Sequence, residues 1–149
     1  MIDDMNSEIE IFREKARKGF VCQYDGCPKS GECLIRMLAD YVPADNHLVQ
    51  CVNPAWVRAK GECGFFRPKS KVRMGRGLLG MFDDIPYAKA IVLRKELLAT
   101  FTRKGFYAMR NGTRLISPEE QQVFADVFKS CGIAEAPRFD SYVDEYWWL

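Results

Sequence analysis

Apolar side chains recur at the spacing of an α-helix in three stretches of the chain, and the first lies near its beginning. Ile9, Phe12 and Ala16 fall on one face of a helix with a period of 3.6 residues. A capping-box pattern predicts that this helix begins at Ser7, and a glycine preceded by basic residues predicts its end at Gly19. We therefore expect a short charged helix here, unlike a secretory signal.

The second periodic stretch covers residues 83–101. Asp83 or Asp84 can cap this helix, and Pro86 would stand in its first turn. Its apolar stripe consists of Ala90, Leu93, Leu97 and Phe101.

The third stretch predicts the clearest helix of the chain. Ser117 is the expected N-cap, Pro118 takes the first helical position, Glu120 completes a capping box, and Gly132 ends the helix. The apolar positions at helical spacing are Val123, Phe124, Val127, Phe128 and Cys131.

Residues 20–69 lack a long periodic stretch and hold five of the six cysteines. Within them "GECLIRMLADYV" has a helical pattern, and "HLVQCV" and "GFF" are candidate short strands. The expected fold is α+β and mainly α. Residues 1–69 would form an N-terminal helix and a small Cys-rich, metal-braced module. Residues 70–149 would form a basic helical half with an acidic, aromatic tail, and both would pack as one unit.

The sequence of residues 102–116 is compatible with two different structures. The segment "GFYAMR-NG-TRLIS" fits a β-hairpin, because Asn-Gly is a strong hairpin signal. The alternative is a short helix that ends near Arg110 and turns Phe106 and Met109 toward the core. We favour the helix because the apolar residues do not alternate cleanly.

Gly75, Gly77 and Gly80 in "RMGRGLLGMFDD" reproduce the G-x-G-x-x-G spacing of dinucleotide-binding loops. That chemistry needs a buried parallel strand before the glycines, and the preceding "RPKSKVRM" is too charged for one. The two aspartates that follow would also repel a phosphate. The glycines therefore predict a flexible bend between the two halves, and not a nucleotide site.

Charge is divided along the chain, although the net charge is only +2. Residues 1–57 hold 6 Lys/Arg and 9 Asp/Glu, residues 58–114 hold 14 and 4, and residues 115–149 hold 2 and 7. A basic middle between acidic ends indicates an anionic partner such as nucleic acid. The alternative is a solvated surface on which the basic residues pair with the acidic ends.

The cysteines carry the strongest chemical signal. They follow a C-x4-C-x5-C pattern with a fourth cysteine thirty residues later, among turn-forming glycines and prolines. Thiolates suit zinc, which is a borderline-soft cation that takes four of them in a tetrahedron. We favour zinc over an iron–sulfur cluster, which uses the same four thiolates, and over ordinary buried thiols. The predicted metal ligands are Cys22, Cys27, Cys33 and Cys63.

The remaining thiols and the lone histidine predict no further chemistry. Cys51 alternates with apolar neighbours, so we expect it to be a core residue of a strand. We expect Cys131 to be a core residue of a helix. His47 is expected at the surface. A nucleophilic cysteine needs a histidine to activate it, and the carboxylates form no marked pair in an apolar setting. The sequence therefore predicts a protein that is not an enzyme.

The segment "LRKELLATFTRKGFYAMRNGTRLISPEEQQVFADVF" resembles the helix-turn-helix of phage-repressor-like regulators. In that family a short second helix enters the major groove of DNA. The resemblance makes residues 102–110 the reading element, although Phe101 stands where the family prefers glycine. The residues expected to contact nucleic acid are Arg103, Lys104, Tyr107, Arg110 and Arg114.

Most of the chain also resembles an uncharacterised family of small Cys-rich bacterial proteins, a domain of unknown function. The matching pieces are "CQYDGCPKSGECLIR", "VNP", "GECGFFR", "VRMGRGLLGMFDDIPYAKA", "ISPEEQQVF" and "FDSYVDEYWW". This resemblance implies that the two halves of the chain belong together in one family, and it implies no known activity.

We therefore expect a non-enzymatic zinc-binding protein that binds nucleic acid as a transcriptional regulator. Two alternatives stay open: a protein–protein adaptor that docks a partner through its exposed aromatic C-terminus, and an iron–sulfur redox protein. No run approaches the ~20 apolar residues that cross a bilayer. The expected location is the cytoplasm, where thiols stay reduced, and no membrane partner is expected.

Overall fold

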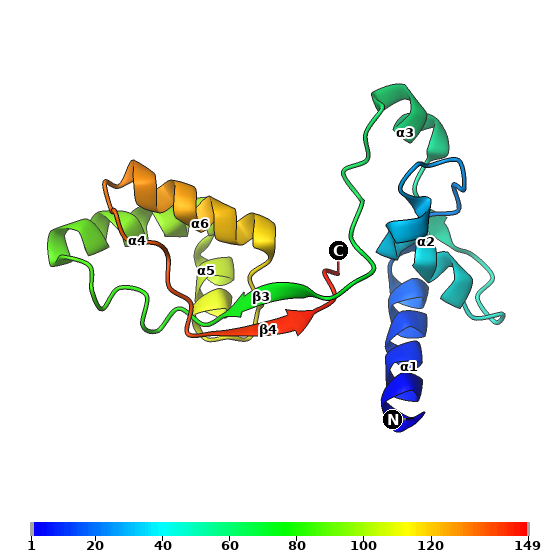
Figure 1. Cartoon of the computed structure of the whole chain (residues 1–149), viewed down its shortest axis with the longest axis horizontal. Helices are drawn as coiled ribbons and strands as arrows, with labels where there is room; N and C mark the ends of the chain where they lie inside the picture. The colour runs from blue at the N-terminus through cyan, green and yellow to red at the C-terminus, as the bar shows by residue number, and fades with distance from the viewer. Residues whose placement is uncertain (1, 149) are drawn as a thin grey trace. The chain divides into compact units, whose positions relative to one another are not determined.

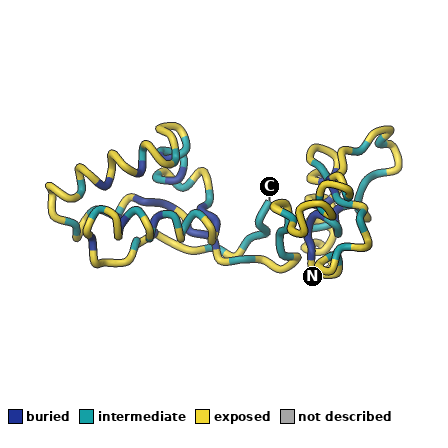
Figure 2. Tube along the Cα trace, turned by 90° about the horizontal axis from the view of Figure 1, so that it is seen from above, coloured by how far each residue is buried: buried dark blue, intermediate teal, exposed yellow. Residues whose placement is uncertain are grey.

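The computed structural model of the chain describes residues 2–148, and these residues form two units. The first unit contains residues 2–71 and 146–148, and the second contains residues 72–145. Each unit has its own cluster of buried hydrophobic side chains, and Figure 2 shows the buried positions along both. Helices account for most of the regular structure and the strands form two small sheets, so the chain is a mainly helical α+β protein.

The first unit begins with helix α1, Ile2–Lys18 (Figure 1). Phe12 and Ala16 are buried on its predicted face, and the helix ends immediately before Gly19. The helix starts ahead of the predicted capping box, so Ser7 lies inside it. Acidic residues in its first turn and basic residues in its last turn complement the helix dipole and support the longer helix.

The Cys-rich part of the first unit contains only short elements. Strand β1 pairs in parallel with strand β2, and β2 is the strand that was predicted within "HLVQCV". The other candidate, "GFF", does not form a strand and lies partly in a turn. Asn53 caps a helix that the sequence pattern did not predict, because its side-chain oxygen accepts a hydrogen bond from Ala55 N at 3.1 Å. The short elements are β1 Phe20–Val21, η1 Ser30–Glu32, α2 Leu34–Leu38, η2 Ala39–Tyr41, β2 Gln50–Cys51 and α3 Pro54–Lys60.

Three helices enclose the core of the second unit. Helix α4 contacts both α5 and α6 (Figure 1), and α6 begins with the predicted capping box of Ser117 and Glu120. Residues 103–110 form a helix and not a hairpin strand, so the favoured alternative is confirmed for this segment. The three helices are α4 Tyr87–Phe101, α5 Arg103–Arg110 and α6 Pro118–Ser130.

The predicted cap of α4 is wrong. The helix begins at Tyr87 after Pro86, and neither aspartate before it caps the helix. Both aspartates instead face Arg138, whose Nη1 donates to Asp84 Oδ2 at 3.1 Å and whose Nη2 lies 3.8 Å from Asp83 Oδ2. The ion pairs hold the two carboxylates in the turn before the helix.

Two antiparallel strands, β3 (Val72–Arg76) and β4 (Ser141–Glu145), complete the second unit. Gly75 also exchanges backbone hydrogen bonds with Ile116, at 2.9 and 2.8 Å, which ties β3 to the segment before α6. Only the last three residues of the charged segment "RPKSKVRM" therefore belong to a strand, and that strand is antiparallel and also contains Gly75.

The glycine loop after β3 holds a carboxylate of its own chain. Asp140 accepts hydrogen bonds from Leu79 N at 2.8 Å and from Gly80 N at 2.9 Å. Gly77 has φ +82°, and a Cβ added there would lie 2.5 Å from Asp140 Oδ2. The loop therefore turns around Asp140 within the second unit, so the prediction of a bend between the two halves is wrong. Backbone N–H groups arranged in this way bind an anion, which here is a carboxylate of the chain itself.

Candidate functional site

Helix α5 has one buried face and one charged face. Phe106 and Met109 are almost completely buried, as the helical alternative predicted, whereas Arg103 and Lys104 are exposed. The helix contains no aspartate or glutamate. Its exposed side therefore carries positive charge that no carboxylate of the same helix offsets.

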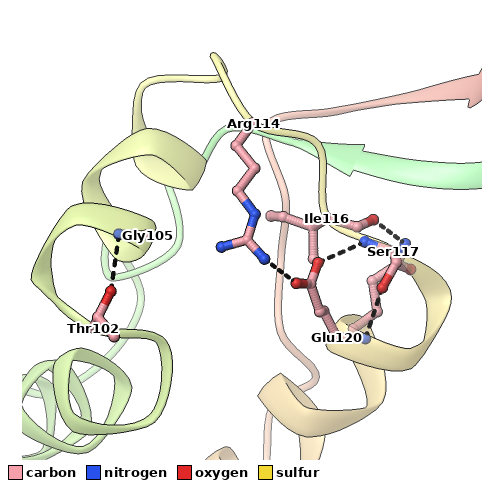
Figure 3. A network of polar contacts seen from close by, with 7 residues as sticks. Thr102, Gly105, Arg114, Ile116, Ser117 and Glu120 are labelled. Carbon is pink, nitrogen blue, oxygen red and sulfur yellow. Dashed lines mark hydrogen bonds and ion pairs between the residues drawn. The ribbon is translucent and has the colours of Figure 1, made fainter. Parts of the chain in front are cut away.

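A single residue, Thr102, joins α4 to α5. Its backbone has φ 62° and ψ 160°, a conformation that is otherwise almost confined to glycine. Its hydroxyl oxygen accepts a hydrogen bond from Gly105 N at 3.2 Å and so caps α5 (Figure 3). This tight turn brings side chains of α4 and α5 together.

Tyr107 of α5 lies among three arginines. Arg94 of α4 donates from Nη2 to the Tyr107 hydroxyl at 2.5 Å. The guanidinium carbons of Arg94 and Arg103 lie 5.8 and 5.7 Å from the centroid of the Tyr107 ring. The pKa of Tyr107 is lowered, first by the hydrogen bond from Arg94 and then by the charges of Arg94, Arg103 and Arg110.

These arginines form no ion pair with an acidic side chain of the described residues. Within residues 2–148, no Asp or Glu side chain lies within ion-pair distance of Arg94, Arg103 or Arg110. Guanidinium groups bind phosphate oxygens through paired N–H donors. Sequence reasoning selected Arg103, Tyr107 and Arg110 but missed Arg94, because only the turn at Thr102 brings the two helices together.

Arg114 belongs to a different network. It forms an ion pair with Glu120, whose Oε2 accepts a hydrogen bond from Ser117 N at 3.0 Å (Figure 3). Ser117 Oγ accepts in turn from Glu120 N at 3.2 Å. The charge of Arg114 is therefore partly offset by a carboxylate at the start of α6, in contrast to the arginines around Tyr107.

The four predicted metal ligands line one pocket of the first unit, with a volume of about 410 Å³. Cys22 follows β1, Cys33 is the N-cap of α2, Cys27 lies in a bend, and Cys63 lies in irregular backbone just before a turn. Two backbone hydrogen bonds fasten these segments together, from Cys22 N to Ile35 O at 3.1 Å and from Leu34 N to Arg67 O at 2.7 Å.

The pocket changes the acidity of one of its thiols, that of Cys22. Burial has the largest effect and raises the pKa of the Cys22 thiol, and a backbone hydrogen bond from Tyr24 partly opposes this rise. The neighbouring thiols Cys33, Cys63 and Cys27 raise the pKa further. Basic side chains also line the pocket, whereas Glu62 is its one acidic side chain among the described residues. The basic residues are Lys29, Arg36 and Arg58.

The pocket is not a finished coordination sphere. Within residues 2–148, no three His, Cys, Asp or Glu side chains are arranged so that they could hold a metal ion. His47 is exposed and is not among the residues that line the pocket. A metal would therefore require the thiols to approach one another.

The other two cysteines lie outside the pocket. Cys51 is exposed, so the prediction of a core strand residue is wrong. Both residues of the two-residue strand that carries Cys51 are exposed, so this strand does not enter the core. Cys131 is partly buried and packs against the core of the second unit.

The aromatic residues at the C-terminal end pack within the first unit and are not an exposed tail. The rings of Tyr146 and Trp148 lie 5.2 and 6.0 Å from that of Phe12, and the Tyr146 hydroxyl donates to Glu8 Oε1 at 2.6 Å. The guanidinium of Arg67 lies 4.4 Å from the Trp147 ring. A partner that docked on these rings would have to displace contacts of the chain itself.

A comparison with known protein families identifies the chain. It belongs to a family of unknown function, DUF6078, whose sequence profile matches residues 5–148. The match spans both units and confirms the resemblance to an uncharacterised family. No curated protein and no solved structure matches the chain. In the part of the chain that the structure describes, no helix combines the length and the apolar character needed to cross a bilayer.

Proposed function

We propose that the protein is a non-enzymatic DNA-binding regulator and that α5 of the second unit makes the central contact. The exposed basic face of α5 carries this proposal, because Arg103 and Lys104 face solvent while Phe106 and Met109 fix the opposite face in the core. Two successive helices followed by a third also resemble a helix-turn-helix, although the single residue Thr102 joins α4 to α5 where that motif has a turn of about 3–4 residues. B-DNA admits an α-helix into its major groove, whereas the major groove of double-stranded RNA is too narrow for side chains to read. We therefore place duplex DNA ahead of RNA.

The geometry favours this function over a protein–protein adaptor. The adaptor hypothesis depended on an exposed aromatic C-terminus, and Tyr146, Trp147 and Trp148 instead make contacts inside the first unit. The basic side chains of α5 remain available to a partner.

Binding of the full chain to a fluorescently labelled duplex at several salt concentrations tests this function. Replacing a phosphate contact with alanine should weaken binding and reduce the slope of log affinity against log salt by about one unit. We expect this result for Arg103→Ala and Lys104→Ala. The matched control is Lys129→Ala, which removes an exposed lysine from the last turn of α6. A folded chain that binds neither DNA nor RNA at about 50 mM salt, where nonspecific binding is strong, would contradict the proposal.

A second candidate function is zinc binding by the first unit, with Cys22, Cys27, Cys33 and Cys63 as ligands. The observation that favours it is the gathering of all four thiols around one pocket. Four thiolates around Zn²⁺ carry a net charge of about −2, and the basic side chains Lys29 and Arg58 at the pocket would offset part of it. Arg36 also lines the pocket, but it already forms ion pairs with Asp25 and Asp40. Zinc would stabilise this region, which contains only short helices and strands. We include a cytoplasmic location in the same proposal, because thiols stay reduced in the cytoplasm.

Metal analysis of the purified full chain tests the zinc site. We expect about one zinc per chain, its loss in Cys33→Ser, and its retention in the control Cys51→Ser, whose side chain is exposed and outside the pocket. All three tryptophans, Trp56, Trp147 and Trp148, lie in the first unit, so tryptophan fluorescence reports the unfolding of this unit. Chelation should lower the unfolding midpoint measured in this way, because metal binding is coupled to folding.

Three results would contradict the zinc proposal. The parent chain and Cys33→Ser could both lack metal and unfold alike. The control Cys51→Ser could lose zinc, which would mean that the four ligands are a different set. Visible absorption with bound iron would indicate the iron–sulfur alternative, because Zn²⁺ is d¹⁰ and colourless.

A further inference from the structure

Arg94 is oriented by the Tyr107 hydroxyl group, and no carboxylate among residues 2–148 forms an ion pair with it. A carboxylate that holds a guanidinium in place also offsets part of its charge, as Glu120 does for Arg114. The Tyr107 hydroxyl accepts a hydrogen bond from Arg94 at 2.5 Å, and a protonated phenol carries no charge. Arg94 is thus oriented while its full positive charge is kept.

Two helices contribute charge to this cluster. Arg94 projects from α4, and Arg103 comes from the first turn of α5. Both side chains belong to exposed residues, and both guanidiniums lie over the Tyr107 ring. Arg110 is half-buried in the last turn of α5 and close enough for its charge to act on Tyr107. Because guanidiniums lie over the ring, we do not expect Tyr107 to stack on a base.

We infer that Arg94, Arg103 and Arg110 form a phosphate-binding cluster for the backbone of duplex DNA, with Tyr107 as the residue that positions Arg94. This inference rests on the proposed DNA binding and adds a contact from α4. In helix-turn-helix proteins the first helix crosses the DNA backbone while the second enters the major groove. An arginine on α4 beside the start of α5 is therefore placed to contact a phosphate group of the DNA backbone. Lys104 is a basic residue of α5 that does not belong to this cluster.

The contribution of Arg94 can be measured by salt titration of DNA binding with the full chain. Each phosphate neutralised contributes about −0.9 to the slope of log affinity against log salt. Between 50 and 200 mM salt, the parent should therefore lose about 3- to 4-fold more affinity than Arg94→Ala. Arg94→Lys should keep the parent slope but bind more weakly, because lysine cannot offer paired donors. Lys129→Ala is again the control.

The positioning role of Tyr107 has its own measurement. Tyr107→Phe keeps the ring but removes the acceptor, so it should weaken binding several-fold at pH 7 with an unchanged salt slope. Ionisation of the phenol places a negative charge among Arg94, Arg103 and Arg110. As the pH rises through the Tyr107 pKa, the parent should lose more affinity than Tyr107→Phe, and a purely packing role for Tyr107 would give the two proteins the same pH profile.

The outcomes separate this inference from the proposed function. If the parent binds DNA and Lys104→Ala weakens binding while Arg94→Ala changes neither affinity nor slope, the arginine cluster is wrong and the proposed function stands. If inorganic phosphate displaces the duplex at constant ionic strength, the cluster selects a free anion and the assignment to the DNA backbone is overturned. If the folded parent binds no DNA, the proposed function itself fails.

Discussion

Thr102 is the residue on which the geometry of α4 and α5 depends. Its φ of 62° and ψ of 160° lie in a region that is costly for any residue with a side chain, by about 1–3 kcal/mol. The hydroxyl offsets part of this cost, because it caps α5 through Gly105 N. In the family that this segment resembles, glycine is expected at the turn, and the glycine-like conformation here falls on Thr102, one residue after Phe101.

Substitutions at Thr102 separate the two effects. Thr102→Ala keeps the unfavourable φ and loses the cap, so it should lower the free energy of unfolding by about 1 kcal/mol. Thr102→Gly also loses the cap but relieves the backbone, so its stability should equal or exceed that of the parent. Urea unfolding followed by circular dichroism measures both. Equal destabilisation by the two changes would show that the backbone conformation of Thr102 carries no strain.

Among the helices and strands, those with strong local signals were predictable. Helix α6 has a capping box and a periodic apolar stripe, and α5 places Phe106 and Met109 inward as its pattern predicted. Strands β3 and β4 were not predictable, because Arg73, Arg76, Asp144 and Glu145 interrupt any apolar alternation and the two strands lie far apart in the sequence. Their pairing depends on long-range contacts, which no local pattern shows.

The glycine loop shows the same limit and leads to a prediction. Asp140 is distant in sequence from Leu79 and Gly80, so the spacing of the glycines alone did not indicate which anion the loop holds. Asp140→Ala removes the acceptor of two backbone donors at an exposed site, and we expect a loss of about 1 kcal/mol in the free energy of unfolding. Thermal unfolding followed by circular dichroism would detect it. Glu135→Ala, at an exposed loop position, is the control, and equal stability of the two variants would show that the Asp140 contact does not hold the loop.

At the level of the whole chain, the two units divide the chemistry between them. The four thiols lie in the first unit, and the arginines around Tyr107 lie in the second. The sequence indicated both kinds of chemistry, because cysteine spacing and clustered charge are visible without a structure. It could not indicate that Arg94 joins Tyr107, or that Glu120 pairs with Arg114, because both pairings depend on how successive helices turn.

The salt dependence of duplex binding by the intact protein tests the central claim most directly. If Arg94, Arg103, Lys104 and Arg110 each neutralise a phosphate, log affinity should fall linearly with log salt, with a slope of about −3 to −4. Fluorescence anisotropy with a labelled duplex between about 50 and 200 mM salt measures this slope. A folded chain that binds with a slope near zero, or that does not bind at the lowest salt, would contradict a DNA-binding role for the second unit.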